Sequence, residues 1–90
     1  MMTAEERILD AGYEDVLIFG SGNGSGDSYD DALIGVSESG RAVYDFEKMV
    51  EWLMVRDGMT SEDAIEWIEY NTIRSLPYAG EGAPIVVYPV

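Results

Sequence analysis

Residues 32–54, ALIGVSESGRAVYDFEKMVEWLM, change from a strand pattern to a helix pattern without a break. The β-prone runs 32–36 and 41–44 flank Ser37-Glu38-Ser39-Gly40, and a short connection that contains glycine between such runs indicates a β-hairpin. Apolar residues then recur at helical spacing, namely Phe46, Met49, Val50, Leu53 and Met54. The stretch therefore predicts a hairpin followed directly by an amphipathic helix, which ends at Gly58.

A second helix is predicted over 60–76, and a last strand near the end of the sequence. Thr60 is placed to cap this helix and Pro77 to close it. The residues expected on its inner face are Ala64, Ile65, Trp67, Ile68, Thr72 and Leu76. Two prolines flank the apolar run 85–88, which suits an edge strand or a strand boundary better than the centre of a sheet.

The N-terminal part of the sequence predicts a short helix and one more strand. Thr3 can cap a helix over 3–11, with glycine following it. The apolar run Val16-Leu17-Ile18-Phe19 predicts a strand that is covered on both faces. Residues 20–31 begin with alternating glycines and predict a flexible loop rich in Gly, Ser and Asp.

The order of these elements defines the expected fold class. Strands grouped together and helices grouped together are typical of α+β proteins. We therefore expect residues 1–90 to form a single domain, with a small, mainly antiparallel sheet of about four strands and two or three helices packed on one face. The sequence has no cysteine, so no disulfide or thiolate site is expected.

Charge is the strongest chemical signal in the sequence. Eighteen Asp and Glu residues stand against five Lys and Arg with no histidine, which gives a formal net charge of −13. Such a surface repels nucleic acid and anionic membranes and attracts basic proteins. The N-terminus lacks the apolar run of a signal peptide, and no stretch reaches the roughly 20 apolar residues of a membrane span. We therefore expect a cytoplasmic protein that binds neither nucleic acid directly nor membranes.

Acidic residues are densest in the second predicted helix. The residues concerned are Glu62, Asp63, Glu66 and Glu69, with Tyr70 near the same face. One interpretation is a solvated face that aids solubility, or an adaptation to salt. The other treats the carboxylates as phosphate surrogates for a groove lined with Lys and Arg, with the aromatic ring as an anchor. Asp27, Asp30 and Asp31 would then form a flexible second acidic patch.

Other kinds of functional site find little support in the sequence. The glycine-rich segment lacks the Lys-Ser/Thr of a P-loop and the helix-opening spacing of a dinucleotide fingerprint. The three aspartates that follow it lack the spacing of an EF-hand, and no histidine is present to activate a serine. We therefore expect no enzyme activity, no cofactor and no bound metal.

Aromatic and polar residues near the predicted inner faces have structural interpretations. Tyr44, Trp52, Trp67 and Tyr78 are expected to make core or subunit contacts, with Trp67 partly buried. Asn71 is polar and close to the inner face of its helix. It is expected to hold the turn that follows this helix, residues 76–80, by hydrogen bonds.

Two segments carry a resemblance to a known group of proteins. They are residues 41–53, and residues 63–74 together with Pro77-Tyr78 and Pro84-Ile85. These segments resemble small acidic proteins encoded by bacteriophages and prophages of Gram-positive bacteria, over about half of the chain from residue 41 onward. The resemblance implies a bacterial host cell as the setting and brings no catalytic residue. As a class, such proteins are similar to inhibitors of host defence, among them anti-CRISPR proteins that occupy DNA-binding grooves of nucleases.

The leading hypothesis is a non-enzymatic phage inhibitor that binds a basic, nucleic-acid-handling host defence protein such as a CRISPR nuclease. The acidic row of the second helix would make the contact. An alternative is an oligomeric sponge for a small nucleotide signal, with Tyr78 and Gly80-Glu81-Gly82 lining a pocket between subunits. A third is a phage structural or assembly protein. Whether the chain forms a homo-oligomer is left open by the sequence.

Overall fold

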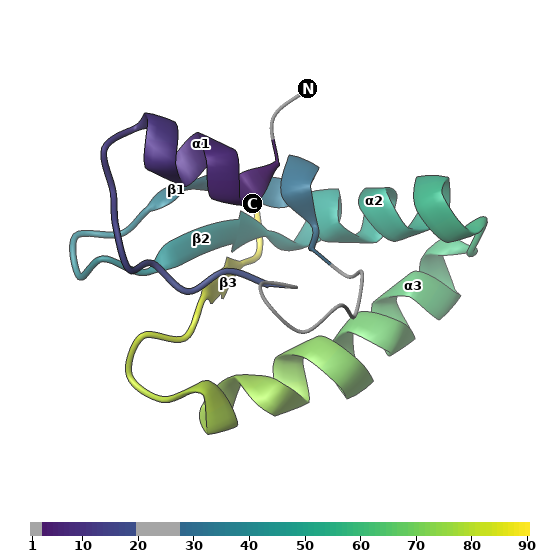
Figure 1. Cartoon of the computed structure of the whole chain (residues 1–90). Helices are drawn as coiled ribbons and strands as arrows, with labels where there is room; N and C mark the ends of the chain where they lie inside the picture. The colour runs from purple at the N-terminus through teal and green to yellow at the C-terminus, as the bar shows by residue number, and fades with distance from the viewer. Residues whose placement is uncertain (1–2, 20–27) are drawn as a thin grey trace.

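The computed structural model describes residues 3–19 and 28–90, which form an α+β fold (Figure 1). The elements in chain order are α1 (Ala4–Asp10), the 3₁₀ helix η1 (Asp30–Ala32), β1 (Leu33–Val36), β2 (Ala42–Asp45), α2 (Phe46–Asp57), α3 (Ser61–Trp67), the π-helix η2 (Ile68–Thr72), the 3₁₀ helix η3 (Ile73–Ala79) and β3 (Ile85–Val87). The predicted fold class is confirmed at this level. The glycines of the predicted loop, up to residue 26, lie outside the described residues.

Within the described residues the sheet has three strands in the order β1-β2-β3, whereas about four were predicted. The hairpin is confirmed, because β1 and β2 pair antiparallel. However, β3 pairs parallel to β2, so the sheet is mixed. After β2 the chain runs through α2 and α3 before it returns at β3, as a parallel pair requires (Figure 1). The prediction that the last strand lies at an edge is confirmed.

The predicted strand over Val16-Leu17-Ile18-Phe19 is wrong, because these residues pair with no strand. Val16, Ile18 and Phe19 still pack against the core. The backbone N–H of Phe19 donates to the Tyr44 hydroxyl at 3.3 Å, and their rings lie 4.6 Å apart. A continuous apolar run indicates contact with the core but not ladder pairing, and this irregular segment is only half-buried, with Leu17 exposed, so the expected cover on both faces is also wrong.

Local capping signals are confirmed at the helix ends. The Thr3 hydroxyl accepts from the Glu6 N–H at 3.2 Å, and the Glu6 carboxylate accepts from the Thr3 N–H at 3.0 Å. These bonds lower the pKa of Glu6, so this cap weakens as pH falls through that lowered pKa. Gly58 follows α2 with φ of 68°, a left-handed conformation that favours glycine.

The helical run that begins at Ser61 continues beyond its predicted end at Pro77. It passes from α-helix to π-helix to 3₁₀ helix and ends at Ala79. Pro77 lies inside η3. Its fixed φ is compatible with a 3₁₀ helix, which explains why the proline does not close the run where a regular α-helix would stop.

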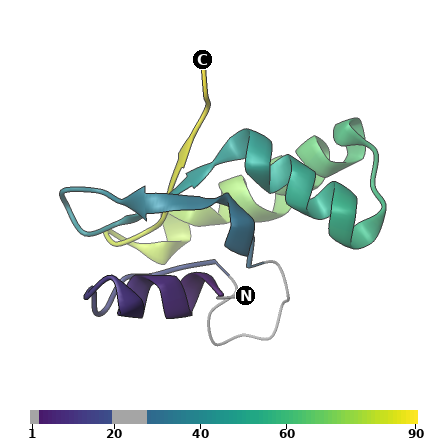
Figure 2. The same ribbon diagram turned by 90° about the horizontal axis from the view of Figure 1, so that it is seen from above.

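One face of the sheet carries the hydrophobic core. Along β2, the buried residues Ala42 and Tyr44 alternate with the half-buried Val43 and Asp45. All three α-helices add side chains to the core cluster that contains Tyr44, including Ile8, Leu53 and Ala64 among others. Figure 2 shows α1 lying along one side of the hairpin, and α2 extending from the far end of the sheet.

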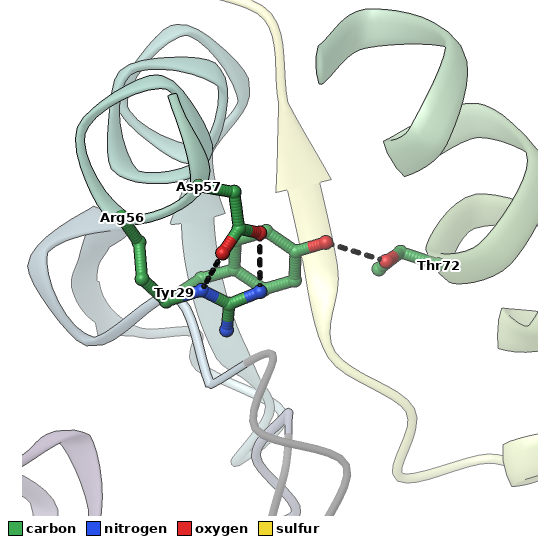
Figure 3. Close-up of polar contacts among 4 residues, drawn as sticks. All are labelled: Tyr29, Arg56, Asp57 and Thr72. Atoms are coloured by element: carbon green, nitrogen blue, oxygen red, sulfur yellow. Dashed lines mark hydrogen bonds and ion pairs between the residues drawn. The ribbon is translucent and has the colours of Figure 1, made fainter. Parts of the chain in front are cut away.

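Tyr29 lies at the junction of the core elements. Its ring is fully buried, 5.6 Å from the ring of Phe19 and 5.2 Å from that of Trp52. Its hydroxyl is 2.8 Å from the hydroxyl of Thr72 in η2, in a buried hydrogen bond (Figure 3). Tyr29 has φ of 49°, a left-handed conformation that costs a non-glycine residue about 1–2 kcal/mol. The contacts of the ring and hydroxyl offset this cost.

We predict that Tyr29→Phe lowers the free energy of unfolding by about 1–2 kcal/mol, because the buried Thr72 hydroxyl loses its Tyr29 partner. Urea denaturation measures the change. Tyr78→Phe is the matched control, since Tyr78 is 91% exposed, and it should leave stability unchanged. The double variant Tyr29→Phe/Thr72→Val should recover part of the loss, since both polar partners are then removed. Equal stability of Tyr29→Phe and the wild type would refute the role of this bond.

Candidate partner-binding surface

The acidic row of α3 and η2 points away from the core. This row, named here the α3 row, consists of Glu62, Asp63, Glu66 and Glu69. Thr60 caps α3, and its hydroxyl accepts from the Asp63 N–H at 3.2 Å. Ala64 and Ile68 are fully buried. Because successive helical residues are roughly 100° apart, Glu62, Glu66 and Glu69 fall on the opposite side. All four carboxylates of the row, that of Asp63 included, belong to exposed residues.

Three of the predicted partner-binding residues line one open groove. The residues that line this groove, named here the Trp67 groove, are Met59, Asp63, Glu66, Trp67, Tyr70 and Asn71. It has a volume of about 460 Å³. The sequence prediction of the site omitted three of these lining residues, namely Met59, Trp67 and Asn71. Spacing by three and four residues along the helix was the signal that would have found Trp67 and Asn71 beside the acidic row.

The prediction that Asn71 holds the turn at residues 76–80 is wrong. Its side-chain N–H donates to the backbone carbonyl of Trp67, four residues earlier, at 3.1 Å. Polar side chains inside a helix often bond back to the preceding turn in this way. Trp67, which was expected to be partly buried, is 39% exposed.

A second groove adjoins the π-helix η2 and shares Tyr70 with the first. The residues that line it, named here the Tyr88 groove, are Glu69, Tyr70, Ile73, Arg74 and Tyr88. Its volume is about 580 Å³. The guanidinium carbon of Arg74 lies 5.2 Å from the centre of the Tyr70 ring. Tyr70, which is 63% exposed, therefore forms a wall of both grooves.

The outer surface of α2 has a mixed charge. A groove of about 500 Å³ is lined there by Asp31, Lys48, Glu51, Trp52, Val55 and Arg56. Arg56 forms an ion pair of 2.6 Å with Asp57 (Figure 3), and its guanidinium carbon lies 4.4 Å from the Trp52 ring centre. Bases and acids thus alternate on α2, whereas no Lys or Arg falls within the acidic row of α3.

The two described members of the predicted second acidic patch have different surroundings. Asp30 and Asp31 belong to η1, and Asp27 lies outside the described residues. The Asp30 carboxylate accepts from the backbone N–H of Ala4 at 2.9 Å and so supports the start of α1. Asp31 is exposed and lines the α2 groove, apart from the α3 row. Asp30 therefore has a structural role.

Two arginines are used to bind backbone carbonyls. Arg7 donates to the carbonyls of Asp30 and Leu33 at 3.1 and 3.0 Å. Arg41 donates to the carbonyl of Ala83 at 2.7 Å. Within residues 3–19 and 28–90, the pair of Arg56 with Asp57 is the only ion pair. None of the carboxylates of the α3 row therefore forms an ion pair within the described part of the chain.

Acidic residues also occur elsewhere on the surface. Exposed examples lie in α1, in the segment after it and in the hairpin turn, namely Glu5, Glu6, Asp10, Glu14, Asp15 and Glu38. The distinction of the α3 row is its density, four carboxylates within residues 62–69, together with the two grooves beside it. The negative charge is therefore widespread, with one local maximum on α3.

The described residues include a buried tyrosine with a raised pKa, but no cluster of metal ligands and no membrane-spanning helix. Burial raises the pKa of Tyr44 to about 12, so its hydroxyl stays protonated and serves as an acceptor for the Phe19 N–H. Residues 3–19 and 28–90 contain no group of three or more acidic residues close enough to hold a metal ion. In the same ranges no helix combines the length and apolarity needed to cross a membrane.

Comparisons of this chain with protein-family models, curated proteins and solved structures found no match. The resemblance of residues 41–85 to phage proteins therefore stays a prediction.

We predict that Asp30→Ala lowers the free energy of unfolding by about 1 kcal/mol, because the Ala4 N–H loses its acceptor, as when a helix cap is removed. Asp31→Ala is the matched control, since this exposed neighbour makes the same charge change, and its effect should stay within about 0.5 kcal/mol. Thermal or urea denaturation compares the two variants. Equal effects of both would mean that Asp30 acts only through its charge.

Proposed function

We propose that this chain is a non-enzymatic inhibitor that binds a basic, nucleic-acid-handling protein through the outward face of α3 and η2. The observation that carries the proposal is the α3 row, whose four carboxylates lie beside aromatic grooves and have no basic partner in the described residues. A solubilising face needs negative charge but no adjoining aromatic walls. The combination of charge and exposed aromatic area is typical of protein interfaces.

The charge pattern supports a partner whose own ligand is a nucleic acid. Helical residues three and four apart place carboxylates in a row with about 5–6 Å between the Cβ atoms. A groove that carries Lys and Arg for a phosphate backbone would accept such a row and release the same kind of bound counterions. The affinity of the complex should accordingly fall as salt concentration rises.

The biological setting of the proposal comes from the sequence resemblance. Residues 41–85 resemble small acidic phage proteins, and the proposed partner is a host defence protein in the bacterial cytoplasm. CRISPR nucleases are the first partners to test, because they hold a guide–target duplex in a positively charged channel. On this proposal the inhibitor occupies that channel in place of nucleic acid, as an anti-CRISPR protein of the nucleic-acid-mimic type.

We predict that Glu62→Lys/Glu66→Lys/Glu69→Lys weakens binding to the target nuclease by about 10- to 1,000-fold, since each reversal replaces an attraction of up to about 1 kcal/mol by a repulsion. The side chains are exposed, so the fold should be retained. Guide-loaded CRISPR nucleases are assayed for cleavage of target DNA with increasing amounts of each variant. Wild-type inhibition should fall with added salt.

A control variant separates the α3 row from the net charge. Glu5→Lys/Asp10→Lys/Glu14→Lys makes the same change of charge at exposed positions in and after α1. It should keep most of the inhibition. Equal loss in both variants would show that overall charge acts without a defined surface, and full inhibition by the α3 variant would refute the proposal.

A further inference from the structure

We infer that the Trp67 groove receives an arginine side chain of the basic partner, with its guanidinium against Tyr70 and paired with Asp63 or Glu66. This inference rests on the proposed function and names the partner chemistry that the surface selects. The partner side chain that enters the groove is arginine in preference to lysine. The evidence is the charge of the groove, its aromatic wall, and the way this chain already uses its own arginines.

The lining of the Trp67 groove is complementary to a planar cation. Two of its six lining residues are acidic and two are aromatic, and none is basic. The exposed ring of Tyr70 offers a face for cation–π contact, and Asp63 and Glu66 stand one helical turn apart on the same side. An anionic ligand such as a phosphate would be repelled by the same two carboxylates.

Two arginines of this chain already place their guanidinium groups over aromatic rings. Arg74 lies over the Tyr70 ring in the Tyr88 groove, which also contains Glu69. Arg56 lies over the Trp52 ring and bonds both carboxylate oxygens of Asp57, at 3.0 and 2.6 Å. The Arg56 guanidinium thus has both an aromatic ring and a carboxylate beside it, and the Arg74 guanidinium has an aromatic ring, with Glu69 lining the same groove. The Trp67 groove presents the same two kinds of group, and its lining supplies no guanidinium.

Physical chemistry favours arginine over lysine at such a groove. The guanidinium is planar, less strongly hydrated than an ammonium group, and can stack on a ring while it donates two parallel bonds to a carboxylate. A lysine ammonium would gain the same long-range attraction but lacks the stacking and the paired bonds. The expected difference at an exposed aromatic site is about two- to fivefold in affinity.

The test compares two peptides of equal charge, acetyl-(Gly-Arg)₄-amide and acetyl-(Gly-Lys)₄-amide, in titrations of the ¹⁵N-labelled full chain at low salt. We expect the arginine peptide to bind about two- to fivefold more tightly. The chain has two tryptophans, so their indole N–H resonances report on separate grooves. The Trp67 resonance should shift on titration, while that of Trp52, whose groove already contains Lys48 and Arg56, should stay in place.

Variants isolate the aromatic and acidic contributions. Tyr70→Leu should reduce the arginine-to-lysine preference to about one while leaving charge-driven binding, whereas Tyr78→Leu, at an exposed tyrosine of η3, should keep the preference. Asp63→Asn/Glu66→Gln should weaken both peptides. Retained folding of each variant is checked by its spectrum in the absence of peptide.

Equal affinity for the two peptides, no binding of either, or a preference that survives Tyr70→Leu would overturn the inference. The outcomes also separate it from the proposed function. If the peptides bind equally but the triple reversal on α3 still abolishes nuclease inhibition, only the arginine inference fails. If arginine is preferred but the triple reversal leaves inhibition intact, the proposed function fails.

Discussion

The buried contact of Tyr29 with Thr72 is the interaction on which the arrangement of the other elements depends. Tyr29 precedes η1, and its ring packs between Phe19 from the N-terminal segment and Trp52 of α2. Its hydroxyl reaches Thr72 at the end of η2. One side chain thus connects the N-terminal segment, α2 and the helical run that carries the acidic row. Because a small domain has few core residues, the loss of one such connection affects a large share of its stability.

Features encoded by neighbouring residues were predictable from the sequence, and features that depend on distant contacts were not. The hairpin, the Thr3 cap and the end of α2 at Gly58 follow from local turn and capping chemistry. The parallel pairing of β3 depends on how α2 and α3 pack, and no local signal specifies it. Likewise, the apolar run 16–19 indicated contact with the core, but the sequence could not show that partial side-chain packing would replace strand pairing.

In the candidate site, too, the features set by local spacing were predictable, and those set by distant contacts were not. Helical periodicity correctly placed Glu62, Glu66 and Glu69 on the exposed side of α3, because Ala64 and Ile68 are anchored in the core. The structural role of Asp30 was missed, since its partner, the N–H of Ala4, lies 26 positions earlier in the sequence. The Tyr88 groove also escaped prediction, because it requires Tyr88, which follows β3, to lie near η2 and η3.

The distribution of the few bases explains why the negative charge of α3 persists in the folded chain. Arg7 and Arg41 bind backbone carbonyls, and Arg56 and Arg74 lie over aromatic rings. Four arginines are therefore committed to packing and backbone contacts, with only one of them in an ion pair within the described residues. Repulsion within the α3 row costs a few tenths of a kcal/mol per pair, which the anchored inner face can offset. A basic partner would relieve this repulsion on binding, so the same charges that weaken the free helix would strengthen the complex.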